Sequence, residues 1–411
     1  MKFLYRTGIL FYSLFVRVAS PFNSKASLFV KGRRNWQKKL AQKIENNARY
    51  LWFHCASLGE FEQGRPLIEA VKQQYPEYRI LLTFFSPSGY EIRKNYELAD
   101  IVMYLPLDTN RNARKFIRLV QPEKAFFIKY EYWHFFIGEL KKQNIPLYIV
   151  SAIFRENQRF FKKDNWSKWY RKMLFHCSHF FVQDERSGEL LQSIGLNNFT
   201  VSGDTRFDRV ATIAHSAKEI PVVEKFKGKQ PLLVAGSTWK PDEELLAEFI
   251  NNHPELKVVF APHEVTSANM NRLEQLLKNP HIRFSKAGEN EIDRFQVLII
   301  DSVGLLSSLY QYGTLAYIGG GFGVGIHNIL EAATFGLPVI FGPNYERFKE
   351  AVELKKLGGA MPVNNFSELE HTLNDFLSKS GRLEGASDVC KNYVEKNVGS
   401  TNLILKKVFN K

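Results

Sequence analysis

The sequence predicts an α/β protein built from two domains. Its 411 residues exceed what one small hydrophobic core normally organises. Short apolar segments alternate with helix-like segments, which is typical of βαβ units and a parallel sheet. The alternation stops once, in a polar segment near residues 211–229, and then resumes. With 45% hydrophobic and 24% charged residues, the chain is neither mainly disordered nor collagen-like.

The first 44 residues are strongly basic and contain no acidic residue, so they carry most of the formal charge of +14. Within them, the apolar stretch 7–16 lies between Arg6 and Arg17. Ten residues are too short to span a bilayer, and no clear cleavage site follows. We interpret residues 1–35 as an amphipathic helix lying on an anionic membrane surface. The alternatives are a first helix packed on the domain, or a single span extended to Phe22.

Residues 36–210 are expected to form the first domain, with a parallel sheet. Seven apolar segments predict its strands: 50–55, 79–84, 101–105, 125–128, 147–150, 179–182 and 199–201. Helix-like segments such as 62–74, 110–120 and 184–194 separate them. The stretch 159–181 combines six basic residues with several aromatic ones. Its aromatic spacing favours core packing, with contact to lipid or phosphate as the alternative.

Residues 211–229 are expected to be a linker, and residues 230–395 a second domain of the same class. Its predicted strands are 232–235, 256–260, 297–300, 315–318 and 339–341. Residues 396–411 are expected to form a helix that packs back on the first domain. Two such domains would face each other across a central cleft. Ligands of parallel sheets bind beyond the carboxyl ends of the strands, so motifs at those ends carry the functional information.

Three charged residues follow strands of the first domain. Glu60 lies in a Ser-Leu-Gly-Glu sequence at a helix start, where a carboxylate could accept a proton from a substrate hydroxyl. It could equally be a helix residue favoured by the helix dipole. Glu131 follows the neighbouring strand. Arg206 could stabilise a developing phosphate charge, or simply pair with Asp204 or Asp208.

In the second domain, a glycine-rich sequence from Tyr317 to Pro343 is the most specific motif. Glycines at 319, 320, 321, 323 and 325 would let the backbone approach a ligand closely. His327 and Asn328 follow, and a helix containing Glu331 would offer N–H groups to a phosphate. The sequence Gly236-Ser237-Thr238 could also hold a phosphate or simply cap a helix. His263 is a further phosphate contact or an ordinary loop residue.

The cysteines and histidines predict neither disulfides nor a metal site. Cys55, Cys177 and Cys390 are too few and too scattered for a disulfide framework, which favours a reducing compartment. His54 and Cys55 have no partner pair at metal-ligand spacing, so strand packing explains them better. The glycine-rich sequence lacks the βαβ context of a dinucleotide fingerprint, and no Walker lysine follows it.

Taken in order, these motifs resemble the 3-deoxy-D-manno-octulosonic acid (Kdo) transferases of lipopolysaccharide synthesis. The resemblance rests on Ser-Leu-Gly-Glu, the Glu131-Tyr132-Trp133 element, Ser-Gly-Asp-Thr-Arg-Phe-Asp, Gly-Ser-Thr and His-Asn-Ile-Leu-Glu-Ala-Ala. It covers nearly the whole chain. It implies the GT-B fold, in which two Rossmann-like domains face a central cleft. It also implies transfer of Kdo from CMP-Kdo to a hydroxyl of the lipid A precursor, with inversion and without a metal or other cofactor.

Carried over by position, the resemblance makes Glu60 the general base and links Glu131 and Arg206 to transition-state stabilisation. The residues expected to contact the donor CMP-Kdo are Gly236, Ser237, Thr238, Ala261, Pro262, His263, Val303, Gly304, Leu305, Gly323, His327, Asn328, Ile329, Leu330 and Glu331. The chain departs from the family pattern at four places. The element usually written ETELWPN reads KYEYWHF here, over residues 129–135. Pro262 replaces a phosphate-binding arginine, Trp239 replaces a histidine, and Arg206 replaces a lysine, which changes hydrogen-bond geometry.

The expected partners are CMP-Kdo, the lipid A precursor and an anionic membrane surface, but no nucleic acid. The expected location is the cytoplasmic side of the inner membrane, with the N-terminal segment as anchor. Two other functions stay open. One is a GT-B enzyme that uses a UDP-sugar on another lipid. The other is a basic protein that binds membranes or nucleic acid without turnover, which would bind any polyanion in a salt-dependent way.

Overall fold

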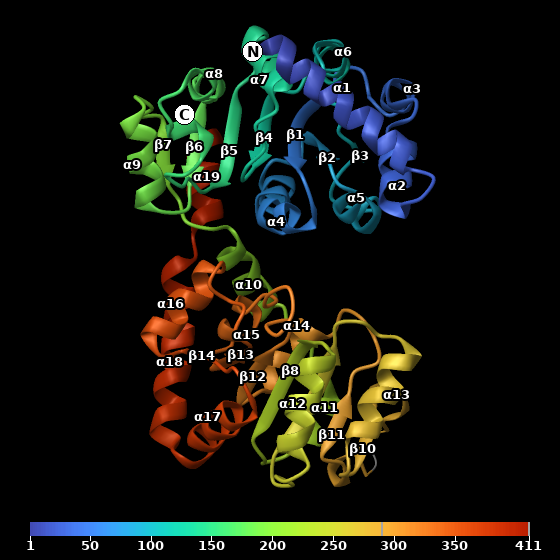
Figure 1. Ribbon diagram of the computed structural model, residues 1–411, viewed down its shortest axis with the longest axis vertical. Helices are drawn as coiled ribbons and strands as arrows, with labels where there is room; N and C mark the ends of the chain where they lie inside the picture. The colour runs from blue at the N-terminus through green and yellow to red at the C-terminus, as the bar shows by residue number, and fades with distance from the viewer. Residues whose placement is uncertain (289–290, 410–411) are drawn as a thin grey trace. The chain divides into compact units, whose positions relative to one another are not determined.

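The computed structural model describes residues 1–288 and 291–409, which form two units. Unit 1 comprises Met1–Arg209 and Gly399–Lys411, and unit 2 comprises Val210–Val398. Each unit contains one seven-stranded sheet in which every pairing is parallel (Figure 1). The predicted α/β class, with two parallel sheets, is therefore confirmed.

The sheet of unit 1 has the strand order β3-β2-β1-β4-β5-β6-β7. Its strands are β1 (Arg49–Cys55), β2 (Tyr78–Phe84), β3 (Ile101–Tyr104), β4 (Lys124–Ile128), β5 (Leu147–Ala152), β6 (His179–Val182) and β7 (Phe199–Val201). The helices between them are α4 (Leu58–Gln74), α5 (Pro87–Arg93), α6 (Asn110–Val120), α7 (His134–Lys142), α8 (Asn165–Leu174) and α9 (Glu185–Ser193). Nearly all residues of the central strands are buried, because helices cover both faces of the sheet.

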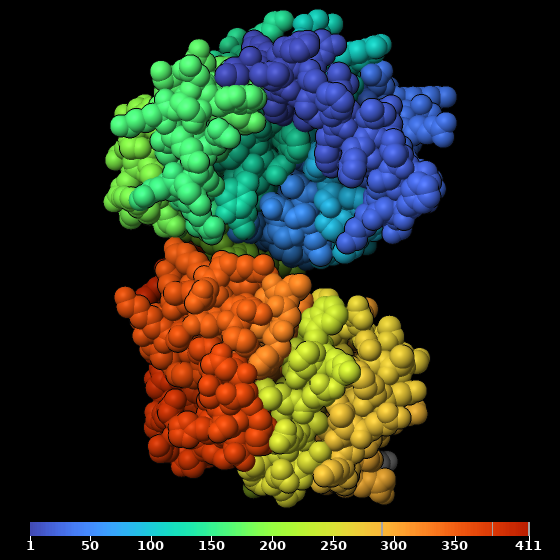
Figure 2. Space-filling model, in the orientation of Figure 1, coloured from blue at the N-terminus to red at the C-terminus, as the bar shows by residue number. Residues whose placement is uncertain are grey.

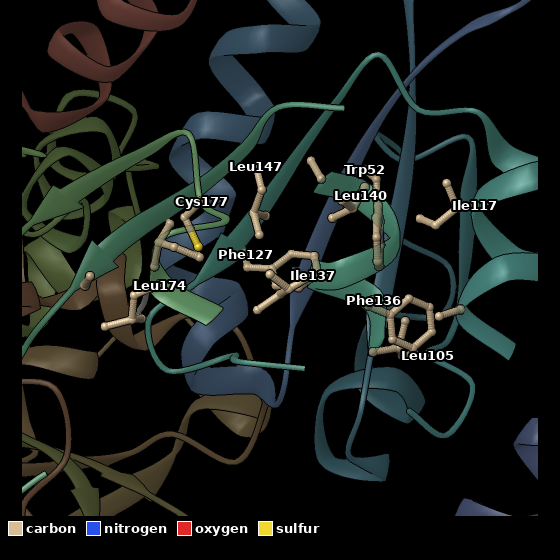
Figure 3. Packing of buried hydrophobic residues seen from close by; sticks show 14 of the residues in the cluster. Trp52, Leu105, Ile117, Phe127, Phe136, Ile137, Leu140, Leu147, Leu174 and Cys177 are labelled. Atoms are coloured by element: carbon tan, nitrogen blue, oxygen red, sulfur yellow. The ribbon is translucent and has the colours of Figure 1, made fainter. Parts of the chain in front are cut away.

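Aromatic residues organise the core between this sheet and helices α6 and α7 (Figure 3). The ring of Trp52 lies 4.9 Å from Phe116 and from Phe127 and 5.6 Å from Phe136, measured between centroids. Its indole Nε1 donates a hydrogen bond of 2.8 Å to Thr83 Oγ1, so the buried polar atom is satisfied. Helix α7, which follows Glu131, is therefore held firmly against the sheet.

Three helices precede the first strand: α1 (Lys2–Ala19), α2 (Ser24–Arg33) and α3 (Trp36–Ala41). No residue of α1 is buried, and Phe3, Phe11 and Phe15 remain 66–76% exposed. Figure 2 shows α1, in dark blue, on the outer surface of unit 1. Among the described residues, no helix combines the length and apolar character that a membrane span requires.

Part of the basic N-terminal segment belongs to the core rather than to a membrane-facing surface. Arg33 is half-buried, and it donates hydrogen bonds to the backbone carbonyls of Leu105 (2.8 Å) and Phe85 (2.6 Å). Its guanidinium lies 3.6 Å from the Phe29 ring centroid. Burial lowers the pKa of Arg33 to about 9. Backbone carbonyls and aromatic faces therefore replace part of the water around the Arg33 guanidinium.

The sheet of unit 2 has the order β10-β11-β9-β8-β12-β13-β14. Its strands are β8 (Leu232–Thr238), β9 (Lys257–Pro262), β10 (His281–Arg283), β11 (Val297–Ile299), β12 (Leu315–Ile318), β13 (Val339–Phe341) and β14 (Ala360–Pro362). Its helices are α12 (Lys240–Ile250), α13 (Ser267–Leu276), α14 (Leu306–Leu309), α15 (Leu330–Ala333), α16 (Lys349–Leu357), α17 (Phe366–Ser378) and α18 (Ser380–Asn397). The edge strands β10 and β14 were not predicted, because neither is a run of bulky apolar residues: β10 is His-Ile-Arg and β14 is Ala-Met-Pro.

The stretch 211–229, predicted to be a linker, is largely helical. It contains the end of α10 (Arg206–His215) and all of α11 (Pro221–Lys227). Val223 and Phe226 of α11 are buried, so this helix is part of unit 2 rather than a free connector. The sequence suggested a linker because its charges are dense, but its few apolar residues are spaced to face the core.

The C-terminal helix α19 (Ser400–Phe409) packs on α4 of unit 1. Asp208 accepts hydrogen bonds of 2.6 Å from the backbone N–H groups of Gly399 and Thr401 and from the Thr401 hydroxyl. Phe409 stacks on Tyr75 at 4.4 Å between centroids. Asp208, two residues after Arg206, therefore holds the start of α19.

Candidate functional site

Glu60 lies at the third position of α4, directly beyond the carboxyl end of β1. Its Oε2 accepts a 3.0 Å hydrogen bond from the backbone N–H of Ser57 and a second one from the Ser57 hydroxyl. This is a capping box, so the predicted structural role of Glu60 at the helix start is real. Oε1 accepts no hydrogen bond from any residue that the structure describes, and the side chain is only half-buried. The fixed carboxylate therefore retains one oxygen for a substrate.

Glu131 lies beyond the neighbouring strand β4, in the loop before α7. Its side chain is 11% exposed, and its Oε2 lies 3.0 Å from His54 Nε2. The indole Nε1 of Trp133 donates a 2.7 Å hydrogen bond to the same oxygen. Two donors therefore hold this carboxylate in one position.

His54 connects Glu131 to the interior of the sheet. It is fully buried in β1, and its Nδ1 lies 2.9 Å from Thr83 Oγ1 on β2. Thr83 in turn accepts a hydrogen bond from Trp52. His54 donates to Glu131 in the tautomer with a proton on Nε2, and in that tautomer Nδ1 accepts the Thr83 hydroxyl. The buried contacts of His54 thus fix the ring that orients Glu131.

Arg206 begins α10 and is tied to Asp204. Its Nε and Nη2 lie 2.9 and 2.8 Å from Asp204 Oδ2. Gln63 of α4 donates to both oxygens of Asp204, at 3.1 and 3.2 Å. Burial would raise the pKa of Asp204, but the charge and hydrogen bonds of Arg206 outweigh it and hold that pKa below its usual value. The predicted ion pair with Asp204 exists, and it orients the guanidinium rather than leaving it mobile.

The three charged groups gather at one edge of the unit 1 sheet. Gln63, which contacts Asp204, lies one helical turn after Glu60 on α4. Burial raises the pKa of Cys55, with further contributions from the nearby charges of Glu60 and Glu131. The pKa of Tyr130 is raised by burial, and Glu60 and Arg206 also act on it. Glu60 and Glu131 therefore lie near Cys55, and Glu60 and Arg206 lie near Tyr130, at the carboxyl ends of β1 and β4.

The glycine-rich loop of unit 2 is shaped by close contacts between backbone segments. The backbone of Gly321 lies against that of Gly342, where an added Cβ would come within 2.5 Å of the Gly342 nitrogen. Asp242, near the start of α12, accepts hydrogen bonds of 2.9 Å from Gly320 N–H, Trp239 N–H and the Tyr317 hydroxyl. This buried carboxylate fixes the loop to the strand β12 that precedes it.

Three aromatic rings stack beside this loop. Trp239 lies 4.6 Å from His263, and His263 lies 4.4 Å from His327, between centroids. Trp239 Nε1 also donates a 3.1 Å hydrogen bond to His327 Nε2. Burial, with the nearby His263, lowers the pKa of His327 to about 4. His327 is therefore neutral at pH 7, and its Nε2 accepts a hydrogen bond from the indole N–H of Trp239.

The other donor-contact candidates lie at ends of the unit 2 elements. Ala261 and Pro262 end β9, and Val303, Gly304 and Leu305 precede α14. Ser237 adopts a left-handed φ of 53° at the end of β8. Asn328 Nδ2 donates to Glu331 Oε1 at 3.0 Å. The predicted helix containing Glu331 is only the four-residue α15, so its dipole contributes little at this loop.

Among the described residues, no group of three or more His, Cys, Asp or Glu side chains could hold a metal ion. The three cysteines are all buried and unpaired.

The architecture is shared with solved structures of nucleotide-sugar enzymes. UDP-GlcNAc 2-epimerase from Neisseria meningitidis has a TM-score of 0.63 and 13% identity, covering 88% of this chain and 100% of that one. The calicheamicin glycosyltransferase CalG4 has a TM-score of 0.57 and 10% identity, covering 89% and 100%. At these identities the likeness defines the fold alone. The chain has the GT-B type of fold.

The sequence comparisons are more specific. The family described as "3-Deoxy-D-manno-octulosonic-acid transferase (kdotransferase)" matches residues 33–209. The 3-deoxy-D-manno-octulosonic acid transferase of Haemophilus influenzae is 27% identical over 381 residues, covering 85% of this chain and 88% of that protein. The enzyme of the same name from Aquifex aeolicus is 28% identical over 365 residues, covering 86% and 94%. The chain is therefore similar to the Kdo transferases over most of its length, and it is a glycosyltransferase.

The structure adds residues that the motifs did not reveal. His54 was interpreted as strand packing, but it also orients Glu131. Gln63 and Asp242 were not singled out, yet they position Asp204 and the glycine-rich loop. A buried polar residue in an otherwise apolar strand was the available signal for His54, because such groups need partners. For Gln63 and Asp242 only the fold reveals the partner.

Proposed function

We propose that this chain transfers Kdo from CMP-Kdo to a hydroxyl of the lipid A precursor, with inversion at the anomeric carbon and without a metal. The observation that carries the proposal is the group of Glu60, Glu131 and Arg206 at one edge of the unit 1 sheet, in a chain similar to the Kdo transferases over most of its length. Each of these charged groups is held by hydrogen bonds before any substrate arrives. Such preorganisation is what electrostatic catalysis requires.

In the proposed reaction, Glu60 acts as general base. The acceptor hydroxyl oxygen forms a bond to the anomeric carbon of Kdo while the bond from that carbon to the CMP phosphate oxygen breaks. The hydroxyl proton passes to Oε1 of Glu60, and CMP leaves with the electron pair. The two hydrogen bonds from Ser57 to Oε2 fix the carboxylate so that Oε1 receives the proton.

Arg206 and Glu131 are assigned to the charge that develops during transfer. Arg206 carries a fixed positive charge, which we assign to the departing phosphate. Glu131, fixed by His54 and Trp133, is assigned to the positive charge that develops on the sugar.

Donor binding is assigned to unit 2. The glycine-rich loop offers backbone groups, and the Trp239–His263–His327 stack offers aromatic faces and imidazole nitrogens. The residues proposed to contact CMP-Kdo are those of the Gly236–Thr238, Ala261–His263, Val303–Leu305 and His327–Glu331 segments, together with Gly323. We propose that residues 230–395 act as the donor-binding domain and residues 36–210 as the acceptor-binding domain.

We further propose that the protein works at the cytoplasmic side of the inner membrane, with an anionic membrane surface as a partner. The support is α1, whose apolar side chains include Phe11 at 66% and Phe15 at 73% exposure beside several cationic residues. A helix of this kind binds in the interfacial region of a bilayer rather than across it.

The test is transfer of Kdo from freshly generated CMP-Kdo to the lipid A precursor, in detergent with a chelator. We expect product from the wild type and a rate reduced by about 10²–10⁴ for Glu60→Gln. Glu62→Gln is the matched control, because Glu62 lies on the same helix but forms an ion pair with Arg93 at 2.8 Å. Competition by CMP and not by UDP is expected. Absence of wild-type product with intact substrates would refute the substrate pair, and inhibition by UDP alone would favour the UDP-sugar alternative.

A further inference from the structure

A basic cavity of about 530 Å³ lies in unit 1, beside the first turn of α1. Four cationic side chains line it, and each comes from a different helix: Lys2 from α1, Arg114 from α6, Lys142 from α7 and Lys172 from α8. Figure 1 shows the start of α1 next to α6 and α7. The cavity therefore combines residues that are far apart in the sequence, and none of the proposed catalytic or donor-binding residues lines it.

The four cations are not neutralised by the surrounding protein. Within the described parts of the chain, none of them forms an ion pair or a side-chain hydrogen bond. One carboxylate, Glu139, also lines the cavity, and it is 8% exposed and accepts a 2.8 Å hydrogen bond from Gln143. Four positive charges against one buried negative charge make the cavity attractive to an anion.

The walls of the cavity supply a hydrogen-bonding group and apolar surface. Nδ1 of His134 is buried without a hydrogen-bond partner in the region that the structure describes. Burial, with the charge of Lys2, lowers the pKa of His134 to about 4, so the imidazole is neutral at pH 7 and one of its nitrogens carries a proton. Phe135, Trp169 and Met173 provide apolar contacts. The cations therefore supply the anion-binding charge, and these three side chains supply an apolar wall.

The cavity is joined to the helix with the exposed apolar face. The Tyr5 hydroxyl of α1 donates a 2.7 Å hydrogen bond to the buried Asp108. Asp108 also accepts hydrogen bonds of 3.1 Å from the backbone N–H groups of Phe135 and Phe136. The Tyr5 ring lies 5.5–5.8 Å from the rings of His134, Phe135 and Trp169. These contacts hold Lys2 at the cavity and orient α1 beside it.

We propose that this cavity binds the phosphate group of a lipid, with the four cations on the phosphate and the apolar wall along the start of the hydrocarbon chain. The exposed phenylalanines of α1 lie on the same helix as Lys2 and would enter the bilayer around that lipid. The inference goes beyond the proposed reaction, since lipid binding needs no sugar donor. A soluble anion is the competing ligand of the same chemistry. The apolar wall favours the lipid.

The test is binding of dihexanoyl phosphatidate, a soluble lipid with a phosphate monoester, to the full-length protein. Binding is followed by the emission of Trp169, which lines the cavity. This emission is obtained by subtracting the fluorescence of Trp169→Phe from that of the wild type. We expect saturable binding, weakened about tenfold or more in Arg114→Gln/Lys172→Gln, which removes two of the four cations. The matched control is Arg118→Gln/Lys168→Gln, which removes the same charge from equally exposed positions of the same helices that do not line the cavity.

The outcomes separate the lipid from its rivals. Loss of affinity in the cavity variant and not in the control supports the proposal, as does much weaker binding of inorganic phosphate. Equal loss in both variants, or no saturable binding, overturns it in favour of general surface charge. Inorganic phosphate bound as tightly as the lipid overturns the lipid assignment in favour of a free anion. Because CMP-Kdo is absent from the assay, failure of the proposed transfer reaction would be a separate result.

Discussion

The two units hold their candidate residues by different means. In unit 1, Glu60, Glu131 and Arg206 are each fixed by side-chain hydrogen bonds, from Ser57, from His54 and Trp133, and with Asp204. In unit 2, the glycine-rich loop is fixed mainly by close approach of backbone to backbone.

This difference matches the chemistry assigned to each unit. Proton transfer and charge stabilisation need a few charged groups in defined positions. Binding of a phosphate by backbone groups needs a loop shape that only glycine permits. Single polar substitutions should therefore impair unit 1 chemically while leaving it folded. Single added methyl groups should impair unit 2 sterically.

The largest effect is expected for Gly321→Ala in unit 2. The added Cβ would lie 2.5 Å from the nitrogen and 2.6 Å from the Cα of Gly342, and backbone cannot move aside as a side chain can. We expect a loss of about 3 kcal/mol in the free energy of unfolding, measured by urea denaturation followed at Trp239. Trp239 is the one tryptophan of unit 2.

Gly323→Ala is the control in the same loop. Its Cβ would meet only the Gly320 carbonyl oxygen at 3.6 Å, an ordinary contact, so we expect a change within about 0.5 kcal/mol. Equal destabilisation by both substitutions would show that the loop is not held by backbone approach, and the contrast between the units would fail.

The sequence predicted the sheets better than it predicted the residues that support the site. Apolar runs such as 147–150 and 315–318 identify buried parallel strands because helices cover both faces. Glu60, Glu131 and Arg206 could be selected because they follow such strands. Asp204 could be named as a partner of Arg206 because it lies two residues away, but Gln63 could not, because it is 141 positions from Asp204 and meets it only in the fold. For the same reason, nothing in the sequence indicated that Lys2 and Lys172 line one cavity.

The second prediction concerns His54→Gln, which tests whether side-chain hydrogen bonds control unit 1. Loss of the imidazole removes one hydrogen-bond partner of the Glu131 carboxylate. The hydrogen bond from Trp133 remains, so the carboxylate shifts its position but stays in the site. We expect kcat for Kdo transfer to fall about 100-fold, with the KM values for both substrates nearly unchanged. A purely structural role for His54 would instead lower the amount of folded enzyme without changing kcat per active molecule.

His179→Gln provides the comparison for His54. His179 lies on β6 of the same sheet, and its Nε2 lies 2.9 Å from Thr200 Oγ1, away from all three charged groups. We expect reduced stability and an unchanged kcat per folded molecule. Similar kcat losses in the two variants would indicate that any histidine of the sheet matters equally, and would remove the special role of His54.

The smallest effect is a pH dependence confined to unit 2. Because burial and His263 hold the pKa of His327 at about 4, the folded state keeps this imidazole neutral while the unfolded chain protonates it near 6.5. The stability that the neutral form contributes is therefore present above pH 6.5 and is lost as the pH falls toward 4.

The same titration can be followed at Trp239. Nε2 of His327 accepts a hydrogen bond from the Trp239 indole N–H, so protonation of Nε2 must break that hydrogen bond. The fluorescence difference between the wild type and Trp239→Phe should then change with a midpoint near pH 4. A midpoint near 6.5 would mean that water reaches His327 freely and that the ring stack does not exclude it.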